Sequence, residues 1–139
     1  MSAFVLDASV AMRWAFRQPA PHPAAEQVLD RLMASDRAVV PILWLYEVMS
    51  VVTKTQRMGS ISAAAADEFL NDLSLLEISI DELSQTAVFQ GARRLAIAYG
   101  LTGYDAVYLE LAQRLQLPLA TLDDELRKAA QLAGVRLLF

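Results

Sequence analysis

Short apolar runs that alternate with longer amphipathic stretches constrain the fold of this chain more than any other feature. Five runs read as strands, at residues 3–6, 38–40, 77–80, 118–121 and 135–138. Helical patterns lie between them, at residues 9–16, 24–34, 42–58, 62–75, 84–99, 102–115 and 124–133. Strands that alternate with helices predict an α/β fold with a mainly parallel sheet and right-handed crossovers.

Length and composition limit what this fold can be. The 139 residues, 55% of them hydrophobic and 20% charged, predict one domain over residues 1–139. Such a chain buries enough surface to fold without disulfides or zinc. Because cysteine is absent and His22 is the only histidine, cysteine nucleophiles, zinc fingers and histidine-rich metal sites are excluded.

The charge balance limits the partners. The net charge is −4, whereas a protein that binds duplex nucleic acid tightly normally has an excess of basic residues. Any contact with nucleic acid should therefore be small, local or mediated by metal. The longest apolar run, residues 38–46, is too short to cross a membrane, which takes about 20 residues. We expect no membrane association and a cytoplasmic location.

Acidic residues fall where ligands bind in parallel sheets, at the carboxyl ends of the strands. Asp7 follows the first strand and Asp123 follows the fourth. Glu47 lies early in the helix that leaves the second strand, and Asp105 lies early in the helix that leads into the fourth. Four carboxylates from distant parts of the chain should therefore meet at one edge of the sheet.

The surroundings of these acids suggest a cation. Glu47 lies between Tyr46 and Val48, in an apolar stretch where an isolated carboxylate is costly. Clustered carboxylates also raise each other's pKa values. A divalent ion would remove both penalties, and Mg²⁺ or Mn²⁺ prefers oxygen ligands. Such a site can activate water and shield an approaching phosphate.

Each acid also has a purely structural interpretation. Asp7 could cap the helix that follows it. Thr102 with Asp105, and Thr121 with Asp124, match capping boxes. Asp124 adjoins Asp123, so that one of the two could bind metal while the other caps. Capping does not account for Glu47, which lies inside an apolar helical run.

Together, the ordered motifs resemble the PIN-domain family, and within it the VapC toxins of bacterial toxin–antitoxin systems. The residues that carry this resemblance are Val5-Leu6-Asp7-Ala8-Ser9, Pro41, Glu47-Val48, Tyr104-Asp105-Ala106-Val107-Tyr108-Leu109 and Ala120-Thr121-Leu122-Asp123. The similarity covers the whole chain in order.

The resemblance implies a three-layer sandwich, with a five-stranded parallel sheet in the order 3-2-1-4-5 flanked by about seven helices. It also implies a metal-dependent endoribonuclease that uses one or two Mg²⁺ or Mn²⁺ ions. Asp7, Glu47, Asp105 and Asp123 match the acidic quartet of the family, and Ser9 and Thr121 match its polar helpers. The implied partners are RNA, a second copy of the chain, and a VapB-type antitoxin that covers the site. Candidates for phosphate contact are Arg13, Arg17, Lys54, Arg93 and Arg94.

Two other functions stay open. A magnesium-dependent phosphatase like the haloacid dehalogenases would also place Asp7 after the first strand, but that family has a second aspartate where this chain has Ser9. A binding module on the same fold would use the acids only as helix caps. Glycine-rich phosphate loops are missing from the sequence, so no nucleotide cofactor is expected.

Overall fold

A computed structural model describes residues 2–82 and 84–139 and contains a parallel sheet of four strands. The strands are β1 (Ala3–Leu6), β2 (Arg37–Pro41), β3 (Ile78–Asp81) and β4 (Leu119–Ala120), in the order β3-β2-β1-β4. All three pairings are parallel, with Val5 opposite both Val39 and Leu119. The predicted α/β class and the central position of the first strand are confirmed.

The expected fifth strand is reduced to a single bridge. Residues 135–138 meet the sheet only where Leu137 pairs with Leu119. Leu119 donates its N–H to Arg136 O at 2.8 Å and accepts the N–H of Leu138 at 2.9 Å. Because β4 has only two residues, its outer side offers one pairing position, and no longer ladder forms.

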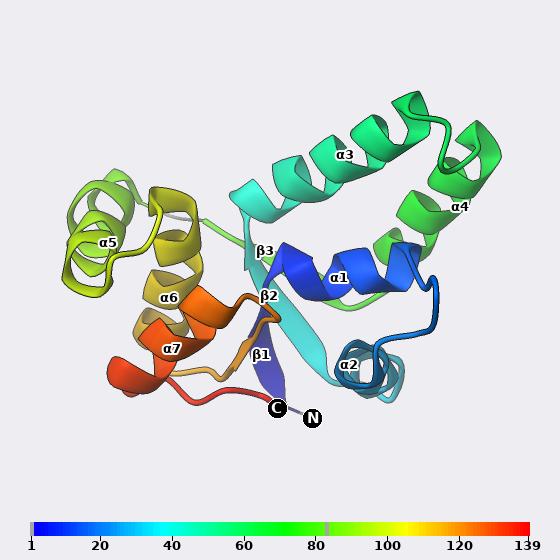
Figure 1. The fold of residues 1–139 in the computed structure, drawn as a ribbon. Helices are drawn as coiled ribbons and strands as arrows, with labels where there is room; N and C mark the ends of the chain where they lie inside the picture. The colour runs from blue at the N-terminus through cyan, green and yellow to red at the C-terminus, as the bar shows by residue number, and fades with distance from the viewer. Residues whose placement is uncertain (1, 83) are drawn as a thin grey trace.

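Helices cover both faces of the sheet, which completes the expected three-layer sandwich (Figure 1). One layer holds α1 (Ala8–Ala15), α2 (Pro23–Met33), α3 (Ile42–Arg57) and α4 (Ala63–Ser74). The opposite layer holds the π-helix η1 (Ala87–Ala92), α5 (Arg93–Tyr99), α6 (Gly103–Leu115) and α7 (Asp124–Leu132). Apolar residues of β1 and α6 make up much of the core between the layers, with Phe4, Leu6, Leu109 and Leu111 fully buried.

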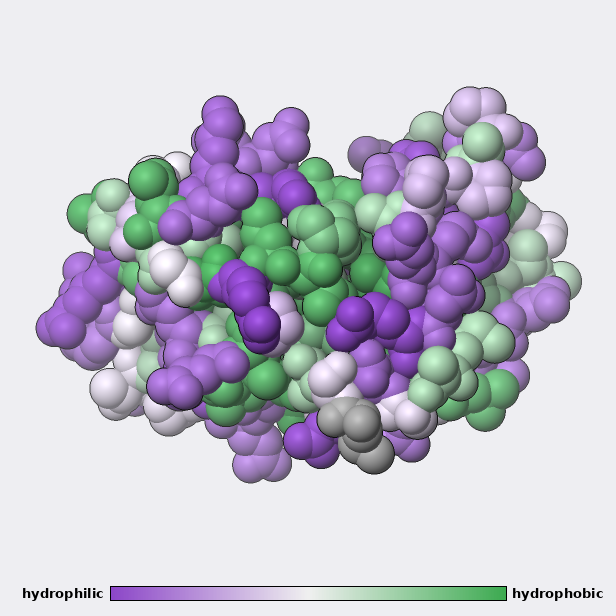
Figure 2. Space-filling model, turned by 90° about the horizontal axis from the view of Figure 1, so that it is seen from below, coloured by the Kyte–Doolittle hydropathy of each residue, from purple (hydrophilic) through white to green (hydrophobic). Residues whose placement is uncertain are grey.

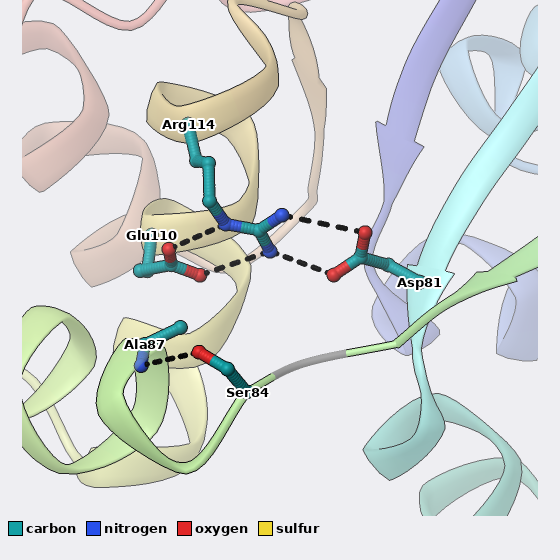
Figure 3. Close-up of polar contacts among 5 residues, drawn as sticks. All are labelled: Asp81, Ser84, Ala87, Glu110 and Arg114. Atoms are coloured by element: carbon teal, nitrogen blue, oxygen red, sulfur yellow. Dashed lines mark hydrogen bonds and ion pairs between the residues drawn. The ribbon is translucent and has the colours of Figure 1, made fainter.

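The stretch between β3 and α6 is continuously helical over residues 85–99, as its sequence predicts, but Ala87–Ala92 within it form a π-helix. Ser84 caps the start of this helix by accepting the N–H of Ala87 at 3.0 Å (Figure 3). The first turns are π-helical, and Gly91 in them approaches α6 so closely that a Cβ would lie 3.2 Å from Glu110 Cγ. Asp81, which ends β3, binds Arg114.

The two edges of the sheet differ in character. Both termini lie at the edge where the strands begin (Figure 1). On this side, hydrophobic residues gather near the centre of the surface between two hydrophilic regions (Figure 2). At the opposite edge the strands end and α1 and α3 begin, so the predicted acidic residues lie there. Among the helices described, none is long and apolar enough to cross a membrane.

Candidate active site

Asp7 is the buried centre of the acidic edge, with only 5% of the residue exposed. It occupies the N-cap position of α1, but its side chain makes no capping hydrogen bond. Its Oδ2 instead accepts the hydroxyl of Ser9 at 2.6 Å and that of Thr121 at 2.7 Å. Asp7 therefore stands at the expected cap position, but its side chain makes no capping hydrogen bond and binds the two hydroxyls instead.

The two hydroxyls are themselves held in place by the backbone. Ser9 Oγ accepts the N–H of Leu122 at 3.0 Å, and Thr121 Oγ1 accepts the N–H of Asp123 at 3.1 Å. A hydroxyl has one proton, so accepting from the backbone leaves that proton to be donated to Asp7. Thr121 is fully buried and does not cap α7, which overturns the capping box expected with Asp124.

Asp123 caps α7 and also faces the other acids. Its Oδ1 accepts the N–H of Leu126 at 2.8 Å. Its charge contributes to the raised pKa values of Asp7 and Asp105, whereas the neighbouring Asp124 is exposed. Asp123 therefore lies within electrostatic reach of Asp7 and Asp105.

Glu47 has a partner that sequence reasoning missed. Tyr108, fully buried on α6, donates its hydroxyl to Glu47 Oε1 at 2.5 Å. The two residues are 61 positions apart, so no local pattern links them. The sequence does contain one signal for this contact. Tyr108 follows Asp105 by three positions, and residues at this spacing share a helix face, so Tyr108 is expected on the same side of the helix as Asp105.

The acids interact electrostatically across four chain segments. Burial is the main cause that raises the pKa values of Asp7, Glu47 and Asp105. Repulsion raises them further, since Asp123 acts on Asp7 and Asp105, and Asp7 and Asp105 act on Glu47. The expected cap of α6 is present, with Thr102 accepting the N–H of Asp105 at 3.1 Å. Each of the four acids predicted to converge therefore lies within electrostatic reach of at least two of the others.

The four carboxylates are ligands that suit a hard cation such as Mg²⁺, but their side chains do not surround a single point closely. Over residues 2–82 and 84–139, no three acidic or histidine side chains lie close enough to hold one ion together. One oxygen each of Asp7, Glu47 and Asp123 already accepts a hydrogen bond from the protein. Carboxylate oxygens are the ligands that Mg²⁺ and Mn²⁺ prefer. Because Mg²⁺ keeps several of its water ligands, carboxylates can also hold it through water. A shared metal ion therefore stays a prediction.

None of the five candidate phosphate contacts is bonded to the acids among the described residues, and their role stays a prediction. Arg17 pairs with Glu26 at 3.1 Å, and Arg93 donates Nε to the carbonyl of Phe89 at 2.8 Å. Arg13 is half-buried on α1, while Lys54 and Arg94 are exposed. In the described part of the chain, no ion pair or hydrogen bond joins any of the five to the acidic group.

Comparison with known proteins agrees with this architecture. Ribonuclease VapC3 of Pyrobaculum aerophilum is 33% identical over 81 residues, which are 58% of this chain and 62% of that protein's length. A solved structure of a protein from Pyrobaculum aerophilum superposes with a TM-score of 0.69 at 26% identity, covering 93% of this chain and 87% of that one. VapBC2 of Rickettsia felis, bound to a DNA fragment from its promoter, gives 0.66 at 16% identity, with 99% and 97% covered.

The family comparison covers nearly the whole chain. Residues 4–132 match the PIN domain, a range that includes all four acids, both residues whose hydroxyls bind Asp7, and the whole sheet except Ala3. This match agrees with the sheet order and with the acidic edge. The chain therefore belongs to the PIN-domain family.

Proposed function

We propose that this protein is a divalent-metal-dependent endoribonuclease that acts as the toxin of a toxin–antitoxin pair. The observation that carries the proposal is the convergence of three acids, Glu47, Asp105 and Asp123, on a fourth, Asp7, which is buried and oriented by two hydroxyls. Burying charge in this way costs stability, and structural capping does not require it. The partial similarity to Ribonuclease VapC3 supports the same reaction.

Asp7, Glu47, Asp105 and Asp123 would hold the Mg²⁺ or Mn²⁺. When bound, the ion would supply an activated water and neutralise charge on the phosphodiester. Ser9 and Thr121 keep Asp7 turned toward the acids, and Tyr108 does the same for Glu47. Asp123 uses Oδ1 to cap α7, which leaves Oδ2 to accept a proton from the attacking water.

Cleavage of RNA tests the reaction. Purified protein should cut RNA with Mg²⁺ or Mn²⁺ and stop in EDTA. Asp7→Asn should abolish cutting while the fold is retained, and Asp30→Asn on the exposed face of α2 should cut normally. Cleavage that persists in EDTA would contradict the metal mechanism. Hydrolysis of a phosphate monoester instead of RNA would favour a haloacid-dehalogenase-like phosphatase, and a protein that neither cuts nor responds to metal would be a binding module.

An apolar surface beside the acids supports the proposed protein partners. A cavity of about 530 Å³ lies between α3, η1, α5 and the start of α6. Tyr46 and Tyr104 line it and are 58% and 69% exposed, and they directly precede Glu47 and Asp105. Ile97, in the same lining, is 79% exposed. Exposed apolar surface of this kind marks interaction sites, and we assign it to a second copy of the chain.

The antitoxin is the other proposed partner. The Rickettsia felis VapBC2 structure shares the fold. An antitoxin segment that lies over the acidic group itself would block the approach of RNA to the carboxylates, and it would leave the apolar cavity to the second copy. Coexpression with the small reading frame next to the gene should give a complex without ribonuclease activity. A complex that still cuts RNA at the full rate would contradict this assignment.

A further inference from the structure

One long segment of this chain is entirely without positive charge. Residues 58–92 contain no Lys or Arg, but they contain six acids: Asp67, Glu68, Asp72, Glu77, Asp81 and Glu82. Since the whole chain has a net charge of −4, the rest of it has a net charge of +2. The segment includes α4 and β3, so the negative charge gathers at the edge of the sheet that β3 forms.

An apolar groove runs along the same edge. It has a volume of about 230 Å³ and lies between α3, α4 and β3. Its rim is open, because Leu45, Met49, Leu70 and Ile80 are each between 39% and 51% exposed. Trp44 lines it from α3 and is buried, so the groove is anchored in the core of the molecule.

The backbone of β3 is open on the side away from β2. Ala38 donates its N–H to Glu77 O at 2.9 Å, and Ala38 pairs with Ile78 in register. In a parallel ladder, alternate residues bond to the same neighbour. The N–H and C=O of Ile80 therefore point outward. Ile78 and Ile80 both line the groove, so the open backbone and the apolar surface adjoin.

Among the described residues, Asp81 is the one acid of this segment that has an ion pair. Arg114 binds Asp81 at 2.6 Å and Glu110 at 2.8 Å, which ties the end of β3 to α6 (Figure 3). Glu77 and Glu82 flank β3 and are exposed. Asp67 is exposed on α4, three positions before Leu70 of the groove.

None of these three exposed acids, Asp67, Glu77 and Glu82, has an ion pair in the part of the chain that the structure describes. The nearest cations in sequence on α3, Lys54 and Arg57, belong to its last turn, beyond the residues that line the groove.

From this arrangement we propose that the β3 edge binds an extended, positively charged segment of a partner polypeptide, which adds to the sheet beside β3. Main-chain hydrogen bonds to Ile80 hold the segment, and every second side chain enters the groove. Its Lys and Arg residues face Asp67, Glu77 and Glu82. RNA is repelled by these acids. A second copy paired through the same surface would bring like charges together, so it is disfavoured as well.

The proposal does not rest on ribonuclease activity, since the edge contains none of the four site acids. The probe is a synthetic peptide of about ten residues with alternating Lys and Val, the length of a typical strand. Binding should weaken as salt is raised and should slow the hydrogen exchange of the Ile80 amide. The matched peptide of alternating Glu and Val should not bind.

Variants locate the binding. The double variant Asp67→Lys and Glu77→Lys should weaken binding about tenfold, because two attractions become repulsions. Asp30→Lys, a control on α2, should bind like the parent protein. Ile80→Pro should abolish binding, because it removes the outward N–H, and proline is tolerated on edge strands. Ile80→Lys serves the same purpose if the proline variant does not fold.

Three results would overturn the proposal. They are equal binding of the Lys and Glu peptides, binding without protection of the Ile80 amide, and a dimer of the protein that Ile80→Lys dissociates. The last result would assign the edge to a second copy. Loss of RNA cleavage in the double variant with peptide binding intact would count against the independence of the two sites.

Discussion

Removal of the charge of Asp7 should make the metal-free protein more stable and unable to respond to metal. Asp7 is 5% exposed, and burial is the main cause of its raised pKa. Burying one ionised group costs several kcal/mol, while each hydrogen bond to a charged group returns about 1.5–3 kcal/mol. Ser9 and Thr121 donate two such bonds, so a penalty of about 1–2 kcal/mol is left at neutral pH.

The sign of this penalty follows from the direction of the shift. A raised folded-state pKa means that folding favours the neutral acid. The associated stability is complete below the unfolded value, which is 3.8 for Asp7, and is lost as the pH rises through the folded value. The metal-free protein should therefore gain stability as the pH is lowered from 7 toward this range. Glu47 and Asp105 act in the same direction, since burial also raises their pKa values.

Asp7→Asn tests this reasoning. The amide oxygen can still accept both hydroxyls, but the charge is gone. In EDTA at pH 7 the variant should melt about 3–8 °C higher than the parent, since about 1 kcal/mol corresponds to 3–4 °C at this length. The gain should shrink as the pH is lowered. Added Mn²⁺ should raise the melting temperature of the parent but not of the variant.

The exposed residue Asp30 provides the matched control, and Asp30→Asn should melt within about 1 °C of the parent in both conditions. An Asp7→Asn protein that melts lower than the parent in EDTA would show that the buried charge does not destabilise the fold. Equal stabilisation of both proteins by Mn²⁺ would place the ion elsewhere. Either result would refute the reasoning.

Three further changes test other parts of the structure. Tyr108→Phe removes the donor to Glu47 and should lower stability by about 1–2 kcal/mol and weaken Mn²⁺ binding measured by calorimetry, whereas exposed Tyr104→Phe should change neither. Arg114→Ala leaves Asp81 and Glu110 without their shared partner and should lower the free energy of unfolding, measured in urea, by about 2 kcal/mol. This value is below that of a fully buried pair because the Arg114 side chain is 36% exposed. Ile97→Glu should dissociate the proposed dimer in light scattering without lowering the melting temperature, because this side chain is 79% exposed.

Sequence patterns were sufficient for the arrangement of the chain. Strand burial produces continuous apolar runs, and parallel strands end at one edge, so the positions of Asp7 and Asp123 after their strands followed directly. The helix starts at Ser62 and Thr102 are where side-chain capping predicted them. These features depend on residues that are close in sequence, which is why local periodicity and capping chemistry report them.

Tertiary structure decided which atoms meet. The bond from Tyr108 to Glu47 joins residues 61 positions apart, and Thr121 turns to Asp7 rather than to its own helix. The π-helical turns at Gly91 and the single bridge at Leu137 likewise depend on what packs against them. Local pattern fixes which edge a residue reaches, but long-range packing selects its rotamer and partner. The exact contacts of the acidic group, and the open groove beside β3, therefore emerged only from the folded chain.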